Sequence, residues 1–358
     1  MNKDVIKKRI KAIRRELNKK KINCLIATKP ANVTYTTGFL GDDSWAAITK
    51  NKVYFLTDSR YTEQAQSECP YCAVLERSDS MAELVSKLIK KQKSVRTLTV
   101  EKSISLADFE ALKKHVKARF RSVANVIETV RSNKDGSEIT AIKDAASIAA
   151  QALKQTLQHI KQGVTENELS GMLDFQIRKL GAKNSFETIV AFGPNASRPH
   201  HQPSKRKLKR KDTILIDFGA KYKGYCSDIT RCFAVGGPTT FYKKIYDVVE
   251  QAQAAAIKMI KAGVKINRVD AAAREVIDKS DLPVYSHGTG HGLGLEIHES
   301  PFLKVESKGT LKAGQVITIE PGVYMPGRLG VRIEDDVLVT QTGCRILTRK
   351  CPHSPLLS

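Results

Sequence analysis

Residues 213–235 read TILIDFGAKYKGYCSDITRCFAV, and this stretch decides the fold of the C-terminal part of the chain. Two apolar runs flank a Lys-Tyr-Lys-Gly turn, which is the pattern of a β-hairpin. If the turn centres on Tyr222 and Lys223, Asp217 and Asp228 lie directly opposite each other, with Cβ atoms roughly 4.5–5.5 Å apart. Two facing carboxylates repel each other unless a cation lies between them. Considered alone, each aspartate is better explained as an ordinary solvent-exposed acidic residue near a turn.

A second hairpin repeats the arrangement in VITIEPGVYMPGRLGVRIEDDVLV, residues 316–339. Glu320 and Glu334 are equidistant from Gly327, so they too can oppose each other. The two-residue period of a strand places Arg332 on the same face as Glu334. Both glutamates interrupt runs of valine and isoleucine, where an unpaired carboxylate is costly and metal coordination is one of few remedies.

Residues 287–299 read HGTGHGLGLEIHE, with a glycine at every second position from Gly288 to Gly294. This spacing matches neither the dinucleotide fingerprint nor the phosphate loop, and the zinc-protease helix H-E-x-x-H is absent. Four glycines disfavour a helix. An extended strand places His287 and His291 on one face and leaves the glycine face open to close approach by another element. Any one of these histidines, taken alone, is more often structural than functional.

Together these stretches offer two aspartates, two glutamates and a histidine. Hard oxygen donors with one imidazole suit a pair of divalent ions bridged by carboxylates. In such sites the two ions lie about 3.5–4 Å apart and share a hydroxide. The five candidate ligands are Asp217, Asp228, His291, Glu320 and Glu334.

Length and composition place the protein in a broad class. The chain has 358 residues, of which 41% are hydrophobic, and this favours two domains with ample core. No run approaches about eighteen apolar residues, so we expect no membrane span. The N-terminus reads as an amphipathic helix followed by a strand, without a secretory signal. We therefore expect a cytoplasmic protein whose seven cysteines are reduced thiols.

One cysteine pair, Cys69 and Cys72, spells the redox-style motif CPYC. A redox site needs such cysteines to open a helix after a strand. Here a helix is expected before the pair, in residues 58–68, and a strand after it, in residues 73–76. A redox function is therefore disfavoured.

The formal net charge of +23 attracts polyanions in general, and the densest basic run is SKRKLKRKD at residues 204–212. Nucleic-acid binding requires a defined basic face with stacking aromatics or a recognisable module. Aromatic residues make up only 6% of the chain, and lysines are spread along all of it. We interpret the charge as a solvated basic surface, with nucleic-acid binding limited to nonspecific electrostatics.

Helices and strands alternate along the first third of the chain, which predicts an α/β domain. The polar turn SNKDGSE at residues 132–138 then predicts a boundary, with domains at residues 1–130 and 131–358. In the first domain, helices are expected at residues 80–92 and 105–116, and strands at residues 52–61 and 97–103.

The second domain opens with helices and continues with strands. A helix is expected at residues 137–161, and Thr165 is placed to cap a second one. Strands dominate after residue 184, interrupted by helices at residues 241–263 and 269–280. Gly263 suits the stop position of the first of these.

The order of the five candidate ligands resembles that of the pita-bread metallopeptidases, which cleave after an N-terminal residue. The matching motifs include His291 in GTGHGLG, Glu320 in IEPG and Glu334 in RIED. Residues 31–39, ANVTYTTGF, and 57–65, TDSRYTEQA, resemble the creatinase-type domain of the proline-specific branch. The resemblance implies an α/β N-terminal domain followed by an α+β pita-bread catalytic domain.

This N-terminal domain disfavours methionine aminopeptidase, whose enzymes lack it. The chain is instead similar to Xaa-Pro aminopeptidases and Xaa-Pro dipeptidases (prolidases). Creatinase, a metal-free relative, is disfavoured because all five ligands are intact.

The resemblance also implies roles for individual residues. His200, in NASRPHHQP, matches a substrate-pocket histidine, and His298 matches the histidine that hydrogen-bonds the reacting carbonyl. His287 lies in the same site, and Arg332 matches an arginine beside a metal ligand. Glu320 takes a proton from the attacking hydroxide and delivers it to the leaving prolyl nitrogen.

These roles imply Xaa-Pro aminopeptidase activity, in which a hydroxide bridging two divalent metal ions cleaves the first peptide bond when proline is second. The alternative is a dipeptidase restricted to Xaa-Pro dipeptides, because loops and subunit packing set the limit on substrate length. A remote alternative is a non-catalytic pita-bread module that binds nucleic acid or proteins, but no ligand is degenerate here.

The resemblance implies Mn²⁺, although oxygen-rich ligation also suits Co²⁺, Zn²⁺ or Fe²⁺. We also expect a homodimer. One position departs from the family: Lys211 stands where glycine is usual, in a turn where we expect it to alter surface charge and not chemistry.

Overall fold

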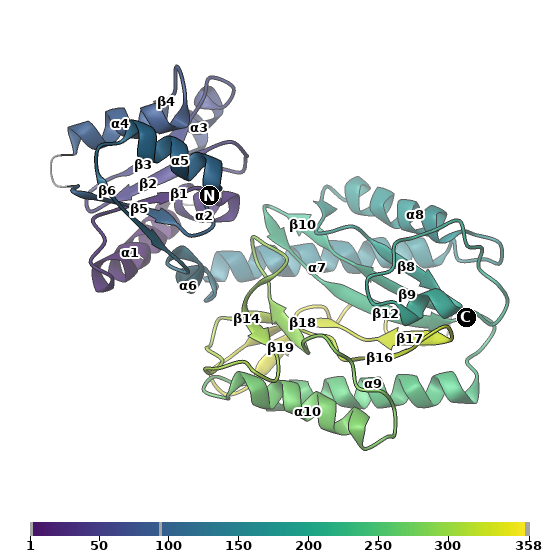
Figure 1. The fold of residues 1–358 in the computed structure, drawn as a ribbon. Coiled ribbons are helices and arrows are strands. Elements are labelled where there is room, and N and C mark those ends of the chain that lie inside the picture. Colours follow the sequence, from purple (N-terminus) through teal and green to yellow (C-terminus); the bar gives the residue numbers. More distant parts are fainter. Residues whose placement is uncertain (1–2, 93–94, 355–358) are drawn as a thin grey trace. The chain divides into compact units, whose positions relative to one another are not determined.

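The computed structural model describes residues 3–92 and 95–354 (Figure 1). The chain divides into two compact units, Met1–Arg131 and Ser132–Ser358. The first is an α/β unit and the second an α+β unit, as the order of apolar and polar segments predicted.

The first unit is built on one mixed six-stranded sheet in the order β4-β3-β2-β1-β5-β6. Strands β1 and β2 are buried along their whole length, which is why they read as continuous apolar runs. The strands are β1 (Cys24–Ala27), β2 (Trp45–Thr49), β3 (Val53–Thr57), β4 (Ala73–Glu76), β5 (Thr97–Glu101) and β6 (Arg119–Val123). The helices are α1 (Lys3–Lys19), α2 (Pro30–Thr37), α3 (Thr62–Glu68), α4 (Met81–Lys91), α5 (Leu106–His115) and α6 (Ile127–Arg131).

Helices α4 and α5 confirm the prediction, and each begins directly after a serine that caps it. The Ser80 hydroxyl accepts a hydrogen bond from the Glu83 backbone N–H at 3.2 Å. The Ser105 hydroxyl accepts one from the Asp108 backbone N–H at 3.0 Å. Each cap satisfies a donor that the first helical turn leaves without an intrahelical partner.

The helix and the strand that flank the CPYC pair lie in the order predicted from the sequence, which disfavours a redox site. Helix α3 precedes the cysteines and strand β4 follows them. Burial raises the pKa of Cys69 to about 11 and that of Cys72 to about 12. Both thiols therefore stay protonated at neutral pH, whereas a reactive cysteine has a lowered pKa.

The second unit places its strands between two pairs of helices, α7 with α8 and α9 with α10 (Figure 1). One apolar core lies under α7 and α8, and another under α9 and α10. The helices are α7 (Gly136–Leu157), α8 (Glu166–Lys179), α9 (Thr240–Met259) and α10 (Ile266–Asp278), with the 3₁₀ helix η1 (Gly193–Ser197).

The strands of this unit form two three-stranded sheets, β11-β10-β7 and β12-β9-β8, a five-stranded sheet, β14-β13-β15-β18-β19, and the pair β16-β17. They are β7 (Lys183–Asn184), β8 (Ile189–Phe192), β9 (Thr213–Phe218), β10 (Ala220–Tyr222), β11 (Tyr225–Cys226), β12 (Ile229–Ala234), β13 (Gly290–Gly292), β14 (Glu299–Leu303), β15 (Val316–Ile319), β16 (Gly322–Met325), β17 (Leu329–Arg332), β18 (Asp335–Val339) and β19 (Cys344–Ile346).

The capping predictions for this unit are right at one helix and wrong at another. Thr165 caps α8, and its side chain forms a reciprocal capping box with Glu168. Helix α9, however, ends at Met259 and not at Gly263. Ile260 leaves the helical conformation with φ −76° and ψ 114°, and its side chain is buried in the core. Gly263 adopts its left-handed conformation, φ 88°, in the turn beyond.

The register of the first hairpin differs from the prediction by two residues. Asp217 pairs with Thr230 and not with Asp228. The turn centres on Lys223 and Gly224, whose φ values are 49° and 85°. A two-residue hairpin turn with positive φ at both positions favours glycine at the second, and only this register places Gly224 there.

The predictions for the second hairpin and for residues 287–299 are partly right. In the second hairpin, Ile319 pairs with Asp335 and Gly322 with Arg332, so Glu320 and Glu334 occupy equivalent positions as predicted. In residues 287–299 the strand is shorter than expected, because β13 covers only three residues. The close approach at its glycines is confirmed, since a Cβ on Gly290 would lie 1.9 Å from the Thr318 carbonyl oxygen.

Lys211 occupies a turn, as predicted, and has φ 70°. A lysine is strained in this left-handed conformation, which explains why glycine suits the position.

Two glycines of this unit give a stability test. A Cβ on Gly219 would lie 1.9 Å from the Ser227 carbonyl oxygen, whereas one on Gly171, in α8, meets nothing within 4 Å. We expect Gly219→Ala to lower the free energy of unfolding by roughly 2 kcal/mol. Gly171→Ala should raise it by about 0.5–1 kcal/mol, because alanine favours a helix. Denaturant titration measures both, and equal effects would contradict the close approach at Gly219.

Candidate functional site

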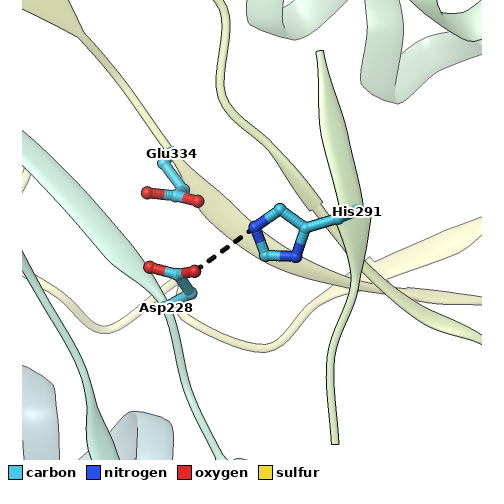
Figure 2. A group of neighbouring side chains, drawn as sticks. All are labelled: Asp228, His291 and Glu334. Atoms are coloured by element: carbon cyan, nitrogen blue, oxygen red, sulfur yellow. Dashed lines mark ion pairs between the residues drawn. The ribbon is translucent and has the colours of Figure 1, made fainter. Parts of the chain in front are cut away.

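Three buried side chains from separate parts of the second unit converge on one point. Asp228 precedes β12, His291 lies in β13, and Glu334 lies between β17 and β18 (Figure 2). One ligand atom from each lies within 4.8 Å of the other two. Within this group, Asp228 Oδ2 lies 3.6 Å from His291 Nε2. The geometry therefore brings together three of the five candidate ligands in one cluster.

A backbone contact fixes the tautomer of His291. The ring Nδ1 lies 3.0 Å from the Gly292 carbonyl oxygen. Because a carbonyl oxygen only accepts, the proton of this hydrogen bond is on Nδ1. Burial lowers the pKa of His291, which favours the neutral ring. The lone pair on Nε2 then faces the carboxylates, as a metal-ligating imidazole requires.

The carboxylates of the cluster are held where their charges repel each other. Burial raises the pKa of Asp228, and the negative charges of Glu334 and Asp217 raise it further. Burial likewise raises the pKa of Glu334, followed by the charges of Glu320 and Asp217. Like charges confined in a dry site destabilise the charged forms of all members unless a cation compensates them.

The other two candidate ligands lie beside this cluster. Glu320 Oε1 is 3.3 Å from His291 Nε2 and accepts a hydrogen bond from the Thr318 hydroxyl at 3.1 Å. Asp217 Oδ2 accepts a hydrogen bond from Arg332 Nη2 at 2.6 Å. In the described part of the chain, Asp217 Oδ1 is buried without a hydrogen-bond partner.

The donor set therefore fits divalent cations. It consists of carboxylate oxygens and one neutral imidazole, which manganese, iron, cobalt and zinc all accept. Two observations support this fit. Among the described residues, Asp217 Oδ1 is buried without a hydrogen-bond partner, and the pKa values of Asp228 and Glu334 are raised. A bound cation would satisfy the oxygen and stabilise the charged carboxylates. The cluster of three offers donors that could hold one ion, and Asp217 and Glu320 lie beside it as further oxygen donors.

A hollow of about 600 Å³ opens onto these carboxylates. All four of the other predicted site residues line it: His200, His287, His298 and Arg332. The exposed ring of His298 lies edge-on to that of His291, with centroids 4.4 Å apart. His298 thus stands at the wall of the hollow, next to the cluster and outside it.

His287 is held by an arginine and a tyrosine. Its Nδ1 donates to the Gly288 carbonyl oxygen at 2.8 Å, and burial lowers its pKa. In the neutral ring, Nε2 accepts from the Tyr324 hydroxyl at 3.0 Å. That hydroxyl oxygen in turn accepts a hydrogen bond from Arg332 Nη1 at 2.8 Å. Arg332, which also binds Asp217, therefore links the ligand set to His287.

Sequence reasoning did not find the polar residues that support the ligands. Thr230 donates its hydroxyl to Glu334 at 2.6 Å and accepts from Arg332 Nε at 3.1 Å. Thr318 donates to Glu320 and accepts from the His291 backbone N–H at 3.0 Å. The sequence did contain a signal for the two threonines. Thr230 is two residues from Asp228 and Thr318 is two residues from Glu320, a spacing that places side chains on the same face of an extended chain. Tyr324 carries no comparable signal.

The segment that carries His298 is anchored by a buried ion pair. Lys134 Nζ lies 3.3 Å from Glu299 Oε1, and both side chains are almost fully buried. A Cβ on Gly294 would lie 2.0 Å from the same carboxylate oxygen. The glycine spacing thus makes room for a neighbouring carboxylate.

The basic run at residues 204–212 is partly used in folding. Arg206 Nη2 lies 2.9 Å from Asp212 Oδ2, and Arg206 Nε donates a hydrogen bond to the Phe192 carbonyl oxygen. The side chain of Leu208 is buried. In the described residues, no helix has the length and apolar character needed to cross a membrane.

Comparison with known proteins identifies the family. Residues 140–341 match the model of metallopeptidase family M24, and residues 9–133 match the creatinase/prolidase N-terminal domain. The chain belongs to metallopeptidase family M24. It therefore has a creatinase-type N-terminal domain and a pita-bread catalytic domain, as the sequence motifs predicted. Membership of this family implies divalent metal ions in the catalytic domain.

Individual relatives resemble the chain over nearly its whole length. It is 33% identical to the Xaa-Pro dipeptidase of Pyrococcus horikoshii, over 97% of this chain and 98% of the relative. The structure of an Xaa-Pro dipeptidase from Bacillus anthracis matches with a TM-score of 0.94 and 36% identity, over 98% of this chain and all of that one. An X-Pro aminopeptidase from Thermotoga maritima matches with a TM-score of 0.89 and 35% identity, over 96% of this chain and all of that one.

Replacing Asp228 tests the cation requirement. We expect about two ions per wild-type chain after manganese loading and fewer in Asp228→Asn. Removing one buried charge should leave the metal-free variant at least as stable as the metal-free wild type. The rise in Tm on adding Mn²⁺ should shrink, because ligand binding to the folded state is what raises it. Metal analysis and thermal unfolding measure these effects, with the exposed Asp247→Asn as control. An undiminished metal-induced rise would contradict the assignment.

Proposed function

We propose that this chain hydrolyses Xaa-Pro dipeptides, cleaving the bond between the first residue and the proline. The observation that carries the proposal is the convergence of Asp228, His291 and Glu334 beside Glu320 in an open hollow, in a chain of family M24. Relatives named Xaa-Pro dipeptidase match it over almost their full length. They support the dipeptidase alternative better than the aminopeptidase activity favoured from the sequence.

The ligands in this proposal are Asp217, Asp228, His291, Glu320 and Glu334. Divalent ions held there supply positive charge that polarises a carbonyl group and makes water acidic enough to yield hydroxide near neutral pH. Glu320 is the proposed proton carrier. Burial raises its pKa, which brings its carboxyl group closer to neutral pH as a general base and acid requires.

The leaving group explains why such a carrier is needed. The nitrogen of an Xaa-Pro bond is tertiary and has no N–H, so it departs only when a proton is supplied to it. A proton accepted at the Glu320 carboxylate and passed to this nitrogen completes the cleavage. His298, exposed in the hollow beside His291, is the proposed hydrogen-bond donor to the substrate carbonyl oxygen.

A second candidate, Xaa-Pro aminopeptidase activity on longer peptides, is favoured by one feature. The hollow adjoins another of about 740 Å³, and both are lined by Phe186, Gln202 and Pro203. The second hollow extends to Asp174 and Arg178 on α8. This space would take residues beyond the proline. An X-Pro aminopeptidase also stands among the similar structures.

Two peptides separate the candidates. We expect the manganese-loaded protein to cleave Gly-Pro, to leave Gly-Ala intact, and to lose activity with a chelator, because the ions supply the charge that activates the carbonyl. Chromatography of the products of Gly-Pro and Arg-Pro-Pro measures the outcome. Cleavage of both peptides would favour the aminopeptidase candidate, and cleavage of neither would refute both.

Replacing His298 tests its proposed role as a donor. His298→Ala should keep the same ion content as the wild type while losing roughly 2–4 kcal/mol of transition-state stabilisation, as removal of one oxyanion donor does. The loss should appear mainly in kcat, because the interaction strengthens as the carbonyl becomes tetrahedral. His291→Ala is the comparison and should lose metal. Equal metal loss in both variants would show that the two histidines do not have separate roles.

A further inference from the structure

Glu166, the first residue of α8, has a completely buried side chain that accepts five hydrogen bonds. Its Oε1 accepts from the Phe192 backbone N–H at 2.8 Å and from Asn195 Nδ2 at 2.8 Å. Its Oε2 accepts from the Ser204 backbone N–H at 3.0 Å and from the Ser204 hydroxyl at 2.5 Å. One carboxylate therefore joins both ends of the segment 192–204.

The fifth hydrogen bond comes from His201. Its Nε2 lies 2.9 Å from Glu166 Oε2, and the ring is buried. Burial alone would raise the pKa of Glu166, but the bonds from Ser204, His201 and Asn195 together lower it below its usual value. The charged carboxylate is therefore the stable form, and because it only accepts, His201 Nε2 is the donor.

The segment 192–204 forms part of the wall of the active-site hollow. It contains η1, and residues 198–204 that follow form neither helix nor strand. Pro199, His200 and Gln202 from this part line the hollow. Such a segment lacks the backbone ladder that orders a strand, so its conformation depends on side-chain contacts. The five hydrogen bonds to Glu166 are contacts of this kind, and they join the two ends of the segment.

We propose that Glu166 is a positioning residue, whose carboxylate fixes the segment 192–204 through His201, Asn195 and Ser204 so that His200 and Gln202 bind peptide substrate. His201 and His200 thereby have different tasks, although both line the hollow. The buried His201 binds Glu166 and anchors the segment, whereas the exposed His200 is free to contact substrate. The identity of the substrate rests on the proposed function, whereas the ordering of the segment does not.

The decisive variant is Glu166→Gln. A glutamine has one accepting oxygen, and its NH₂ group would face donors, so at least two buried donors lose their partner. Glu168→Gln is the matched control, because Glu168 is exposed and binds Thr165 at the start of the same helix. Both variants perturb the N-terminus of α8, but only Glu166→Gln releases the segment.

Two measurements test the proposal. For Gly-Pro, we expect KM to rise about tenfold in Glu166→Gln with a smaller change in kcat and unchanged metal content. Amide hydrogen exchange should become faster in peptides covering residues 192–204 in Glu166→Gln and stay unchanged there in Glu168→Gln. The exchange measurement requires no activity, so it remains informative if the protein does not cleave Gly-Pro.

His201 provides a second pair of variants in case Glu166→Gln fails to fold. His201→Phe keeps the ring volume but removes the donor, and should raise KM and exchange in the segment. His201→Gln can place its amide nitrogen near the position of Nε2 and should restore most of both properties. Unchanged exchange in Glu166→Gln and His201→Phe, or faster exchange with unaltered KM, would overturn the proposal. If Glu168→Gln has the same effects as Glu166→Gln, the role is only to stabilise α8, which would also overturn it.

Discussion

The main constraint on the catalytic domain is that its fold holds several carboxylates close together, where their negative charges repel each other. Asp228 and Glu334 are buried beside His291, and burial raises the pKa of each. The charges of neighbouring carboxylates raise both pKa values further: Glu334 and Asp217 act on Asp228, and Glu320 and Asp217 act on Glu334. No packing of apolar side chains relieves such a cluster, whereas a divalent cation does. The two helix pairs and the strands between them supply the rigidity to hold these acids against their repulsion, because residues from separate strands must be fixed to share one ion.

Rigidity at the site comes from polar residues that bind the ligands and each other. Thr230 joins Glu334 to Arg332, and Arg332 joins Asp217 to the Tyr324 hydroxyl. When one oxygen of a carboxylate accepts such a hydrogen bond, the orientation of the second oxygen is fixed as well. Glu166 has the same effect on the wall of the hollow, where it accepts bonds from a segment without regular structure. Ligands and wall are thus fixed by the same means, a hydrogen bond from a buried neighbour.

Most of the fold could be predicted from the sequence because it depends on local patterns, and the sequence also named the three side chains that converge in the structure, Asp228, His291 and Glu334. Apolar periodicity and capping residues located the helices, and the equal spacing of Glu320 and Glu334 from Gly327 placed these two residues at equivalent positions of the hairpin. The predicted register at Asp217 was wrong. The sequence allows a two-residue turn at Tyr222 and Lys223 or at Lys223 and Gly224, and only the second, which the structure adopts, uses the glycine. The anchoring of His201 by Glu166 could not be predicted, since 35 positions separate residues whose contact depends on the tertiary fold.

The balance of charge gives a further reason to expect two cations. Among the five proposed ligands and Arg332, four carboxylates face one guanidinium, while His291 is neutral. Three negative charges therefore remain uncompensated in a buried site. One divalent ion leaves a residual negative charge, which low-dielectric surroundings penalise. Two divalent ions leave a single positive charge, and this is the condition that favours a bound anion. A site that must both attract a hydroxide and hold a carbonyl oxygen as it becomes negative benefits from that sign of residual charge.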